Sequence, residues 1–80
     1  MKKPIELNVT MLARIETLSA KERDVLGYVG KGYMQAEICK ALKVNGNTVQ
    51  THKSHIKRKL KLRDSGDLAR VAVLHLEKQK

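Results

Sequence analysis

The chain has 80 residues, of which 41% are hydrophobic, so it makes one small domain whose core is too modest to enclose a substrate cavity. Its 17 Lys and Arg against 8 Asp and Glu give a net charge of +9, a balance typical of proteins that bind nucleic acid and, less often, anionic membranes. The absence of Trp, Phe, a signal peptide and any apolar run of roughly 20 residues argues against a membrane and indicates a cytoplasmic protein.

Residues 1–17 are predicted to form an N-terminal arm or linker. Its first seven residues include two lysines and a proline, which are typical of a linker. Asn8 is a suitable cap for a short helix. The apolar side of that helix is predicted to hold Val9, Leu12 and Ala13, with Ile15 close by. The main domain is then expected over residues 18–80.

Two helices are predicted next in the chain. Ser19 and Glu22 match a capping box, so the first helix runs from about Ala20 to Lys31, and Gly32 supplies a left-handed stop. The second helix is expected from about Gln35 to Leu42. The side chains predicted to be buried by the pair are Val25, Leu26, Val29, Ile38, Cys39 and Leu42. As the only cysteine, Cys39 cannot form an internal disulfide, and its place in this stripe favours a reduced thiol.

The third predicted helix is strongly basic. The sequence Asn45-Gly46-Asn47 is expected to break the chain, with Asn45 as the cap, and the helix should end near Lys61. At 100° per residue its apolar members fall within a narrow arc that packs on a core. They are Val49, Ile56 and Leu60. The stretch from residue 50 to 63 holds six Lys or Arg and no acidic residue, so its free side suits a polyanion.

A fourth helix is predicted to begin at Asp64 or Ser65. It carries two adjacent apolar arcs, one with Leu68, Val71, Ala72 and His75, the other with Ala69, Val73 and Leu76. One small core needs only one of these arcs. The predicted fold class is all-α, a small four-helix helix-turn-helix bundle with a possible extra N-terminal helix.

The order and spacing of these residues resemble the LuxR-type helix-turn-helix domain, the output domain of many bacterial response regulators and quorum-sensing receptors. The matching positions are Leu18-Ser19, Glu22, Val25-Leu26, Gly32, Glu37-Ile38, Leu42, Val44, Thr48-Val49, His52, Ile56 and Lys59-Leu60. The resemblance implies a DNA-binding domain for transcription regulation, with the third helix in the major groove and a fourth helix that often mediates dimerisation.

The chain departs from the family pattern at several positions. Met34, Gln35 and Ala36 replace the usual Ser or Thr, Asn and Lys, which weakens the cap of the second helix and removes a phosphate contact. Gln50 replaces a usual Lys at a position that commonly reaches DNA, which leaves the operator preference open. Asn45 replaces a usual Ser and is an equivalent cap.

Candidate DNA contacts follow from the face of the third helix that points away from the core. Gln50, Thr51 and Ser54 are predicted to read bases, because Gln can pair with adenine, the Thr methyl can meet a thymine methyl and Ser can bond to any base edge. A second group is predicted to bind phosphates. It consists of Thr48, His52, His55, Lys57, Arg58, Lys59 and Lys61.

Other chemistry has little support in the sequence. His52 and His55 lack a third metal ligand in their helix, so no metal or cofactor is expected. Tyr28 and Tyr33 are too few for a stacking platform, and no nucleophile motif or phosphate loop occurs, so the protein is not predicted to be an enzyme.

The leading hypothesis is a sequence-specific regulator that binds double-stranded DNA as a homodimer, paired through Ala69, Val73 and Leu76 of the fourth helix. RNA polymerase is a possible further partner. One alternative is an interaction module that pairs with another regulator and binds DNA weakly. This alternative stays open because Gln50 and Ala36 replace basic residues that are usual in the family. Another alternative is an RNA-binding domain, although A-form major grooves do not readily admit a helix.

Overall fold

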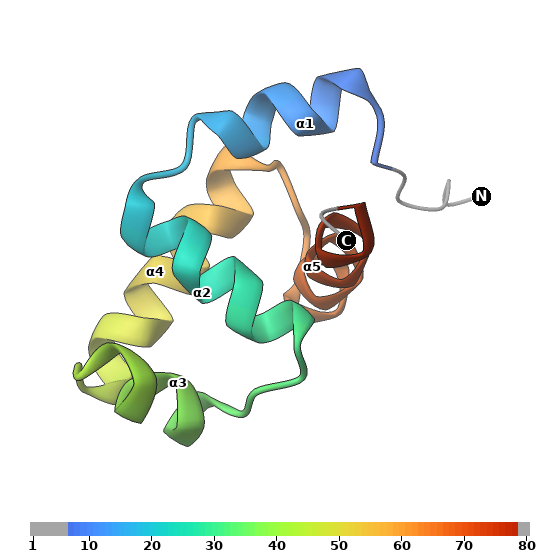
Figure 1. Cartoon of the computed structure of the whole chain (residues 1–80). Helices are drawn as coiled ribbons and strands as arrows, with labels where there is room; N and C mark the ends of the chain where they lie inside the picture. The colour runs from blue at the N-terminus through green and yellow to red at the C-terminus, as the bar shows by residue number, and fades with distance from the viewer. Residues whose placement is uncertain (1–6, 79–80) are drawn as a thin grey trace.

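The computed structural model describes residues 7–78, and this part of the chain forms five helices and no strand (Figure 1). They are α1 (Val9–Glu16), α2 (Ala20–Gly30), α3 (Gln35–Leu42), α4 (Gly46–Lys59) and α5 (Ser65–Lys78). The predicted all-α class and the extra N-terminal helix are therefore confirmed. The first six residues of the predicted arm lie outside the described residues.

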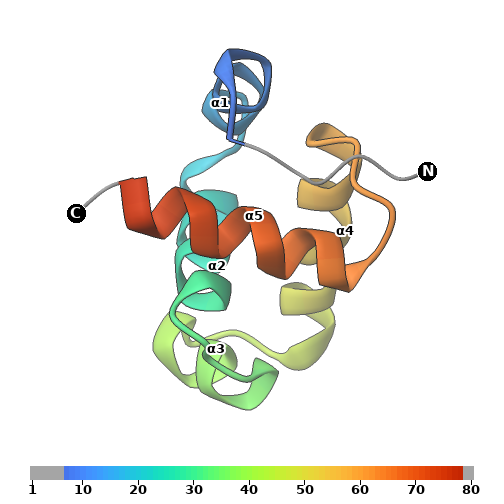
Figure 2. The same cartoon turned by 90° about the vertical axis from the view of Figure 1, so that its right-hand side faces the viewer.

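Helix α2 lies at the centre of the fold, because it packs against both α4 and α5 (Figures 1 and 2). Helix α3 packs on α4, and the two form the helix-turn-helix pair. Helix α5 runs across α2 rather than along it (Figure 2). The buried core draws on every helix and on the turns beside them. Its members are Met11, Ile15, Leu18, Val25, Leu26, Ile38, Val49, Ile56, Leu60, Leu68, Val71 and Ala72.

Helix α1 forms where Asn8 predicted it, since the Met11 N–H donates to Asn8 Oδ1 at 2.9 Å. Its predicted apolar side is wrong at Val9 and Ala13. Met11 and Ile15 are buried, whereas Val9 is 83% exposed and Ala13 also faces solvent. Apolar side chains occur all round this short helix, so several faces could be buried, and the one with the longer Met and Ile side chains removes more area from water. Met11 and Ile15 thus tie α1 into the same core as the domain predicted to begin at residue 18.

Three helices end in the same way, with a residue in left-handed backbone conformation just after the last turn. These residues are Gly32 with φ of 85°, Lys43 with φ of 57° and Lys61 with φ of 56°. In each case the next N–H donates to a carbonyl five residues back: Tyr33 to Tyr28, Val44 to Cys39 and Leu62 to Lys57, at 3.0, 3.1 and 2.8 Å. This is the hydrogen-bond pattern of the Schellman motif, and only the first of the three residues is the glycine that usually occupies it.

The turn between α3 and α4 differs from its prediction. Asn45 caps α4 as expected, because the Thr48 N–H donates to Asn45 Oδ1 at 2.8 Å. Gly46 and Asn47, however, are already helical. The chain reverses at Lys43 instead, whose left-handed conformation ends α3.

Two close contacts complete the packing. A Cβ atom placed on Gly30 would lie 2.5 Å from the carbonyl oxygen of Ala72, so glycine at this position lets α2 and α5 cross closely. The rings of Tyr28 and Tyr33 pack on each other with centroids 4.9 Å apart. Val29, Cys39 and Leu42, predicted to be buried, pack against the core but are only half-buried.

Across residues 7–78, every helix is too short or too polar to cross a membrane.

Candidate DNA interface

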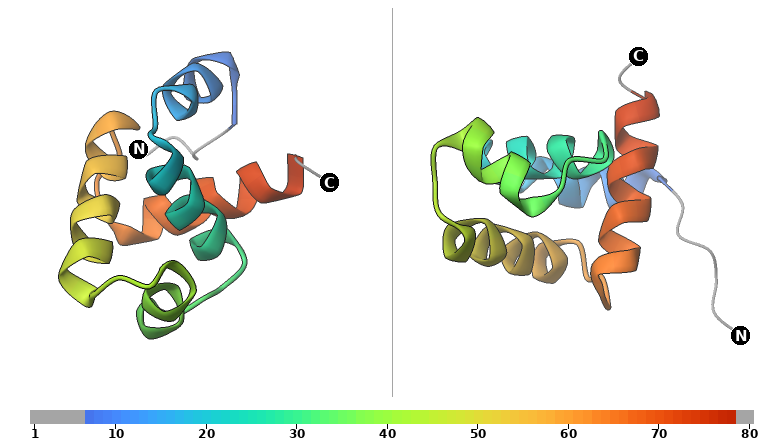
Figure 3. Two further views of the ribbon diagram at one scale, coloured as in Figure 1. Left: turned by 60° about the vertical axis from the view of Figure 1, so that its left-hand side comes forward. Right: turned by 90° about the horizontal axis from the view of Figure 1, so that it is seen from below.

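Helix α4 has one packed side and one uncovered side. Val49, Ile56 and Leu60 are fully buried, which confirms the predicted inward direction. No other helix of the described residues covers the opposite side, as both views in Figure 3 show. The uncovered side is therefore the place where a partner can reach α4.

The three predicted base-reading residues lie on this uncovered side, ahead of the cations of the last turn. Gln50, Thr51 and Ser54 are all exposed. The Thr51 hydroxyl donates to the Asn47 carbonyl oxygen at 2.9 Å, so the methyl group is the part of Thr51 that is free for an outside contact. The side chains of Gln50 and Ser54 make no hydrogen bond to other described residues, which leaves their polar atoms available.

The C-terminal half of α4 carries the cations. Arg58 and Lys59 are exposed and Lys57 is half-buried. Together with His55, Arg58 and Lys59 line a shallow hollow of about 310 Å³. Lys61 lies beyond the last helical residue, where its left-handed backbone turns the chain toward α5.

One acidic residue reaches this basic region from another helix. Glu22 of α2 has a side chain only 6% exposed, and its Oε1 atom accepts hydrogen bonds from the Ser19 N–H at 2.9 Å and from Lys59 Nζ at 2.8 Å. Its Oε2 atom lies 3.5 Å from Nδ1 of His55. Lys59 Nζ also lies 3.5 Å from the carbonyl oxygen of Thr17. Lys59 therefore joins the α1–α2 turn, α2 and α4.

These contacts set the charge of Glu22. Burial by itself raises the pKa of its carboxyl, but the hydrogen bonds from Lys59 and Ser19, together with the positive charges of Lys59 and His55, lower that pKa overall. Glu22 is thus a carboxylate at neutral pH, buried behind a cationic surface. The capping role of Glu22 was predicted from the sequence and is confirmed by its contacts with Ser19, but no periodicity pairs Glu22 with a lysine 37 residues away.

Two further predicted phosphate contacts are less available than the cations. Thr48 is half-buried, and its hydroxyl lies 3.0 Å from Oδ1 of Asn45. His52 is half-buried, and its Nδ1 atom is buried without a hydrogen-bond partner among residues 7–78. Any phosphate contact of His52 would therefore have to use Nε2.

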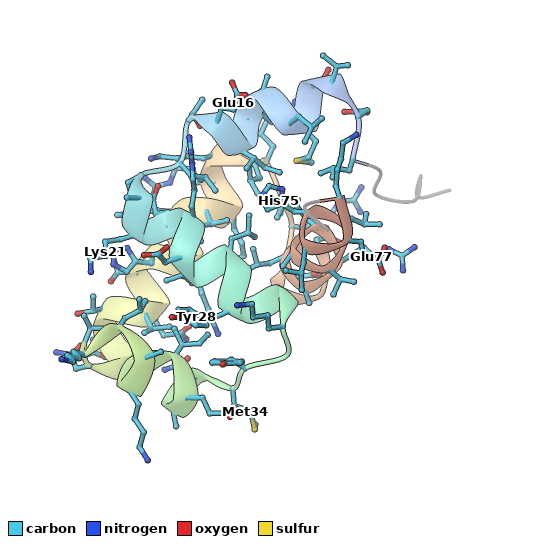
Figure 4. All side chains as sticks on the ribbon, viewed as in Figure 1. Glu16, Lys21, Tyr28, Met34, His75 and Glu77 are labelled. Carbon is cyan, nitrogen blue, oxygen red and sulfur yellow. The ribbon has the colours of Figure 1, made fainter. Side chains whose placement is uncertain are left out.

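The start of α3 shows the weakened cap that the sequence predicted. Met34 is 72% exposed and its side chain makes no capping hydrogen bond (Figure 4). The Met34 N–H instead donates to Oε1 of Glu37 at 2.8 Å. Gln35 bridges the two helices of the pair, since its Nε2 lies 3.4 Å from the carbonyl oxygen of Gly46.

The outer side of α5 carries an apolar strip. Ala69 and Val73 are exposed, Val73 by 41%. Leu76, predicted to join them, is half-buried and lies over α2, where its Cβ would be 3.4 Å from a Cβ on Gly30. Leu74, which was not predicted to join the strip, is half-buried as well and lines a hollow of about 470 Å³ together with Ala69 and Val73. The exposed strip of α5 is therefore defined by Ala69 and Val73, with the half-buried Leu74 at its edge.

The chain resembles known bacterial regulators over this region. The family model "Bacterial regulatory proteins, luxR family" matches residues 16–72. The oxygen regulatory protein NreC of Staphylococcus carnosus is 39% identical over 56 residues, which cover 70% of this chain and 26% of that protein. The transcriptional regulatory protein MctR of Rhizobium johnstonii is 33% identical over 60 residues, which cover 75% and 28%.

The chain thus spans about a quarter of the length of these relatives. No solved structure matches it at a significant level. The family match covers both helices of the helix-turn-helix pair, the buried Glu22 and the start of α5. The chain belongs to the luxR family of bacterial regulatory proteins, and its helix-turn-helix is a DNA-binding domain for transcription regulation rather than an enzyme.

Proposed function

We propose that this domain binds duplex DNA at specific sequences, with α4 in the major groove, and that it does so as a homodimer paired through α5. The observation that carries the proposal is the division of the uncovered side of α4. The neutral hydrogen-bonding side chains of Gln50, Thr51 and Ser54 come first along it, and cations occupy its last turn. A major groove admits one helix, and the N-terminal part of a recognition helix usually meets the base edges.

Base reading is assigned to Gln50, Thr51 and Ser54. The free amide of Gln50 can pair with N6 and N7 of adenine, and the free methyl of Thr51 can meet the methyl of thymine. The exposed hydroxyl of Ser54 can donate to or accept from any base edge, so it adds affinity with less sequence choice.

Phosphate binding is assigned to the cations that follow along α4. Lys57, Arg58 and Lys61 lie where a helix leaves the groove floor and passes the sugar-phosphate strands. Such contacts fix the register of a protein on DNA and give affinity without sequence choice. Thr48 and His52, with fewer free polar atoms, are assigned weaker phosphate contacts.

Homodimer formation is assigned to the exposed strip of α5. A two-fold pairing of Ala69, Val73 and Leu74 would place two copies of α4 on one side of the duplex, about 10 base pairs apart. The strip is far smaller than a standard interface, so DNA would complete the pairing by bringing two copies together. Contact with RNA polymerase stays a prediction.

The proposal is tested by selecting bound sequences from random duplexes, then measuring affinity for the selected duplex at several salt concentrations. Each neutralised phosphate contributes roughly −0.9 to the slope of log affinity against log salt, so a dimer with about six contacts should give a slope near −5. Two exposed positions on α4 supply a matched pair of variants. Arg58→Ala should reduce the slope by about 0.9 per protomer and keep the sequence preference.

Gln50→Ala should keep the slope and relax the preference at one or two base pairs, by about 1 to 3 kcal/mol for a lost bidentate contact. If no sequence is enriched and salt has no effect on retention of the duplex, groove docking by α4 is wrong. If duplex RNA is retained as well as duplex DNA, shape recognition of RNA replaces base reading as the function.

A further inference from the structure

The cationic half of α4 contains two groups whose positions depend on one buried carboxylate. Glu22 holds Lys59 Nζ at 2.8 Å and faces His55 Nδ1 at 3.5 Å. Both Lys59 and His55 are among the predicted phosphate contacts, and the two contacts with Glu22 affect them in opposite ways.

Lys59 is drawn away from an outside phosphate. An ammonium group has three donors, and two of them are directed at Oε1 of Glu22 and at the carbonyl oxygen of Thr17. The charge of Lys59 is also neutralised by the carboxylate, so the pair together adds no net charge to the DNA-facing surface. One donor is left for a phosphate, and moving Lys59 fully to a phosphate would leave a buried carboxylate uncompensated, which is costly.

His55 is directed toward an outside phosphate. Its Nδ1 atom faces Glu22, so Nε2 is the ring nitrogen left for an external partner, and its side chain is 45% exposed at the hollow shared with Arg58. A carboxylate behind one ring nitrogen fixes the orientation of the ring and the nitrogen that carries the proton.

Charged groups from two helices surround His55. Glu22 of α2 lies behind its Nδ1 atom, and Arg58 and Lys59 of its own helix line the same hollow. A DNA phosphate at Nε2 would add a second negative charge on the open side. This addition favours the imidazolium, which can donate from both nitrogens, to Glu22 on one side and to the phosphate on the other.

We propose that Glu22 is a positioning residue of the DNA interface, and that His55, rather than Lys59, binds the phosphate at this point and takes up a proton as DNA binds. This inference rests on the proposed function of α4. The direction of the pH dependence follows from linkage. Because the complex would hold more protons than the free protein and DNA, the affinity for DNA rises as the pH falls. The change is limited to about tenfold per pH unit for each protomer, because His55 binds at most one proton.

The test measures proton uptake directly. The 80-residue protein is titrated with the selected duplex by calorimetry at pH 7 and constant salt, in two buffers of different ionisation enthalpy. The difference between the two binding heats, divided by the difference between the two ionisation enthalpies, gives the number of protons taken up per protomer. We expect a value between zero and one for the unchanged protein, a clear loss in His55→Gln, and retention in the matched control His75→Gln, whose ring lies at α5 between α1 and α2.

A second variant tests the positioning role. In Glu22→Gln the amide oxygen can still accept from the Ser19 N–H, so the cap of α2 is kept. Without the carboxylate, Lys59 is released toward the phosphates. We expect proton uptake to fall while the slope of log affinity against log salt steepens by about 0.9 per protomer, a combination that a purely structural loss would not produce.

The outcomes separate this inference from the proposed function. If the unchanged protein binds no duplex, both are wrong. If the duplex binds but His55→Gln takes up as many protons as the unchanged protein, only this inference is overturned. Should Glu22→Gln fail to fold, the comparison of His55→Gln with His75→Gln still decides whether His55 takes up the proton.

Discussion

Helices α4 and α5 are built alike on the inside and differently on the outside. Each has 14 residues, and each buries a short apolar seam, Val49 and Ile56 in α4 and Leu68, Val71 and Ala72 in α5. The outer side of α4 is basic and polar, whereas the outer side of α5 carries an exposed apolar strip. The inner seams determine how the helices pack, so the two outer sides are free to serve different partners.

The largest expected effect comes from separating α5 from α2. Gly30→Ala places a Cβ 2.5 Å from the Ala72 carbonyl oxygen, and backbone must shift to relieve the clash. We expect the free energy of unfolding to fall by about 1 to 3 kcal/mol in urea denaturation. Gly27→Ala is the matched control on the same helix, because its Cβ meets nothing within 4 Å. It should stabilise α2 by about 0.5 to 1 kcal/mol. Equal effects of both variants would contradict a close crossing at Gly30.

The next effect concerns the ion pair between Lys59 of α4 and Glu22 of α2. Lys59→Ala leaves the buried Glu22 carboxylate without its main partner. Because Lys59 itself is 40% exposed, water compensates in part, and we expect a loss of about 1 to 2 kcal/mol. Arg58→Ala, one residue earlier and exposed, removes the same charge and should change stability by less than about 0.5 kcal/mol.

The loss in Lys59→Ala should depend on acidity. The lowered pKa of Glu22 means that its carboxylate contributes stability above the ordinary value of 4.5, and that this contribution disappears as the pH falls through the lower folded value. Thermal unfolding of both variants at pH 7 and at acid pH measures the difference. If Lys59→Ala and Arg58→Ala remain equally stable at pH 7, the Glu22–Lys59 ion pair contributes nothing.

A third effect distinguishes the outer side of α5 from other exposed apolar positions. Val73→Glu places a carboxylate beside its own symmetry mate in the proposed dimer, while in the monomer the side chain is already 41% exposed. We expect nearly unchanged thermal stability and a loss of cooperative binding to an operator with two half-sites. Val9→Glu, at a position 83% exposed on α1, changes the charge equally and should keep the cooperativity. Loss of cooperativity in both variants would point to charge alone.

The smallest effect is expected at His75 of α5, whose side chain shares a hollow with residues of α1 and α2 (Figure 4). Burial, together with the charge of Arg23, lowers its pKa below the ordinary 6.5. His75 therefore binds a proton more readily in the unfolded chain than in the folded one. The free energy of unfolding falls as the pH drops below 6.5. His75→Gln should flatten the dependence of the unfolding temperature on pH in this range. An unchanged pH profile would show that His75 is not the responsible group.

Much of the fold could be predicted from local signals. The caps at Asn8, Ser19 and Asn45 and the stop at Gly32 marked helix ends, because each acts within five residues. The buried seam of α4 followed from its 3.6-residue period. The buried side of α1 could not be predicted, since its choice depends on which helices it meets.

The candidate site was predictable in type but not in detail. Charge and exposure along α4 indicated a polyanion surface, yet the Glu22–Lys59 pair joins residues far apart in the chain. The place of Leu76 against Gly30 depends on the angle at which α5 crosses α2. Local periodicity carries no information on that angle.

At the two lysines with left-handed backbone, the residue that favours folding differs from the residue that favours DNA binding. Lys43 precedes α4 and Lys61 follows it, each in a conformation that costs a non-glycine residue about 1 kcal/mol. Glycine there would make a more stable domain with two fewer positive charges, one at each end of the helix proposed to enter the groove. Engineering of this domain for heat resistance should therefore lower its proposed affinity for DNA first at the ends of α4. A screen for stability alone would select against DNA binding.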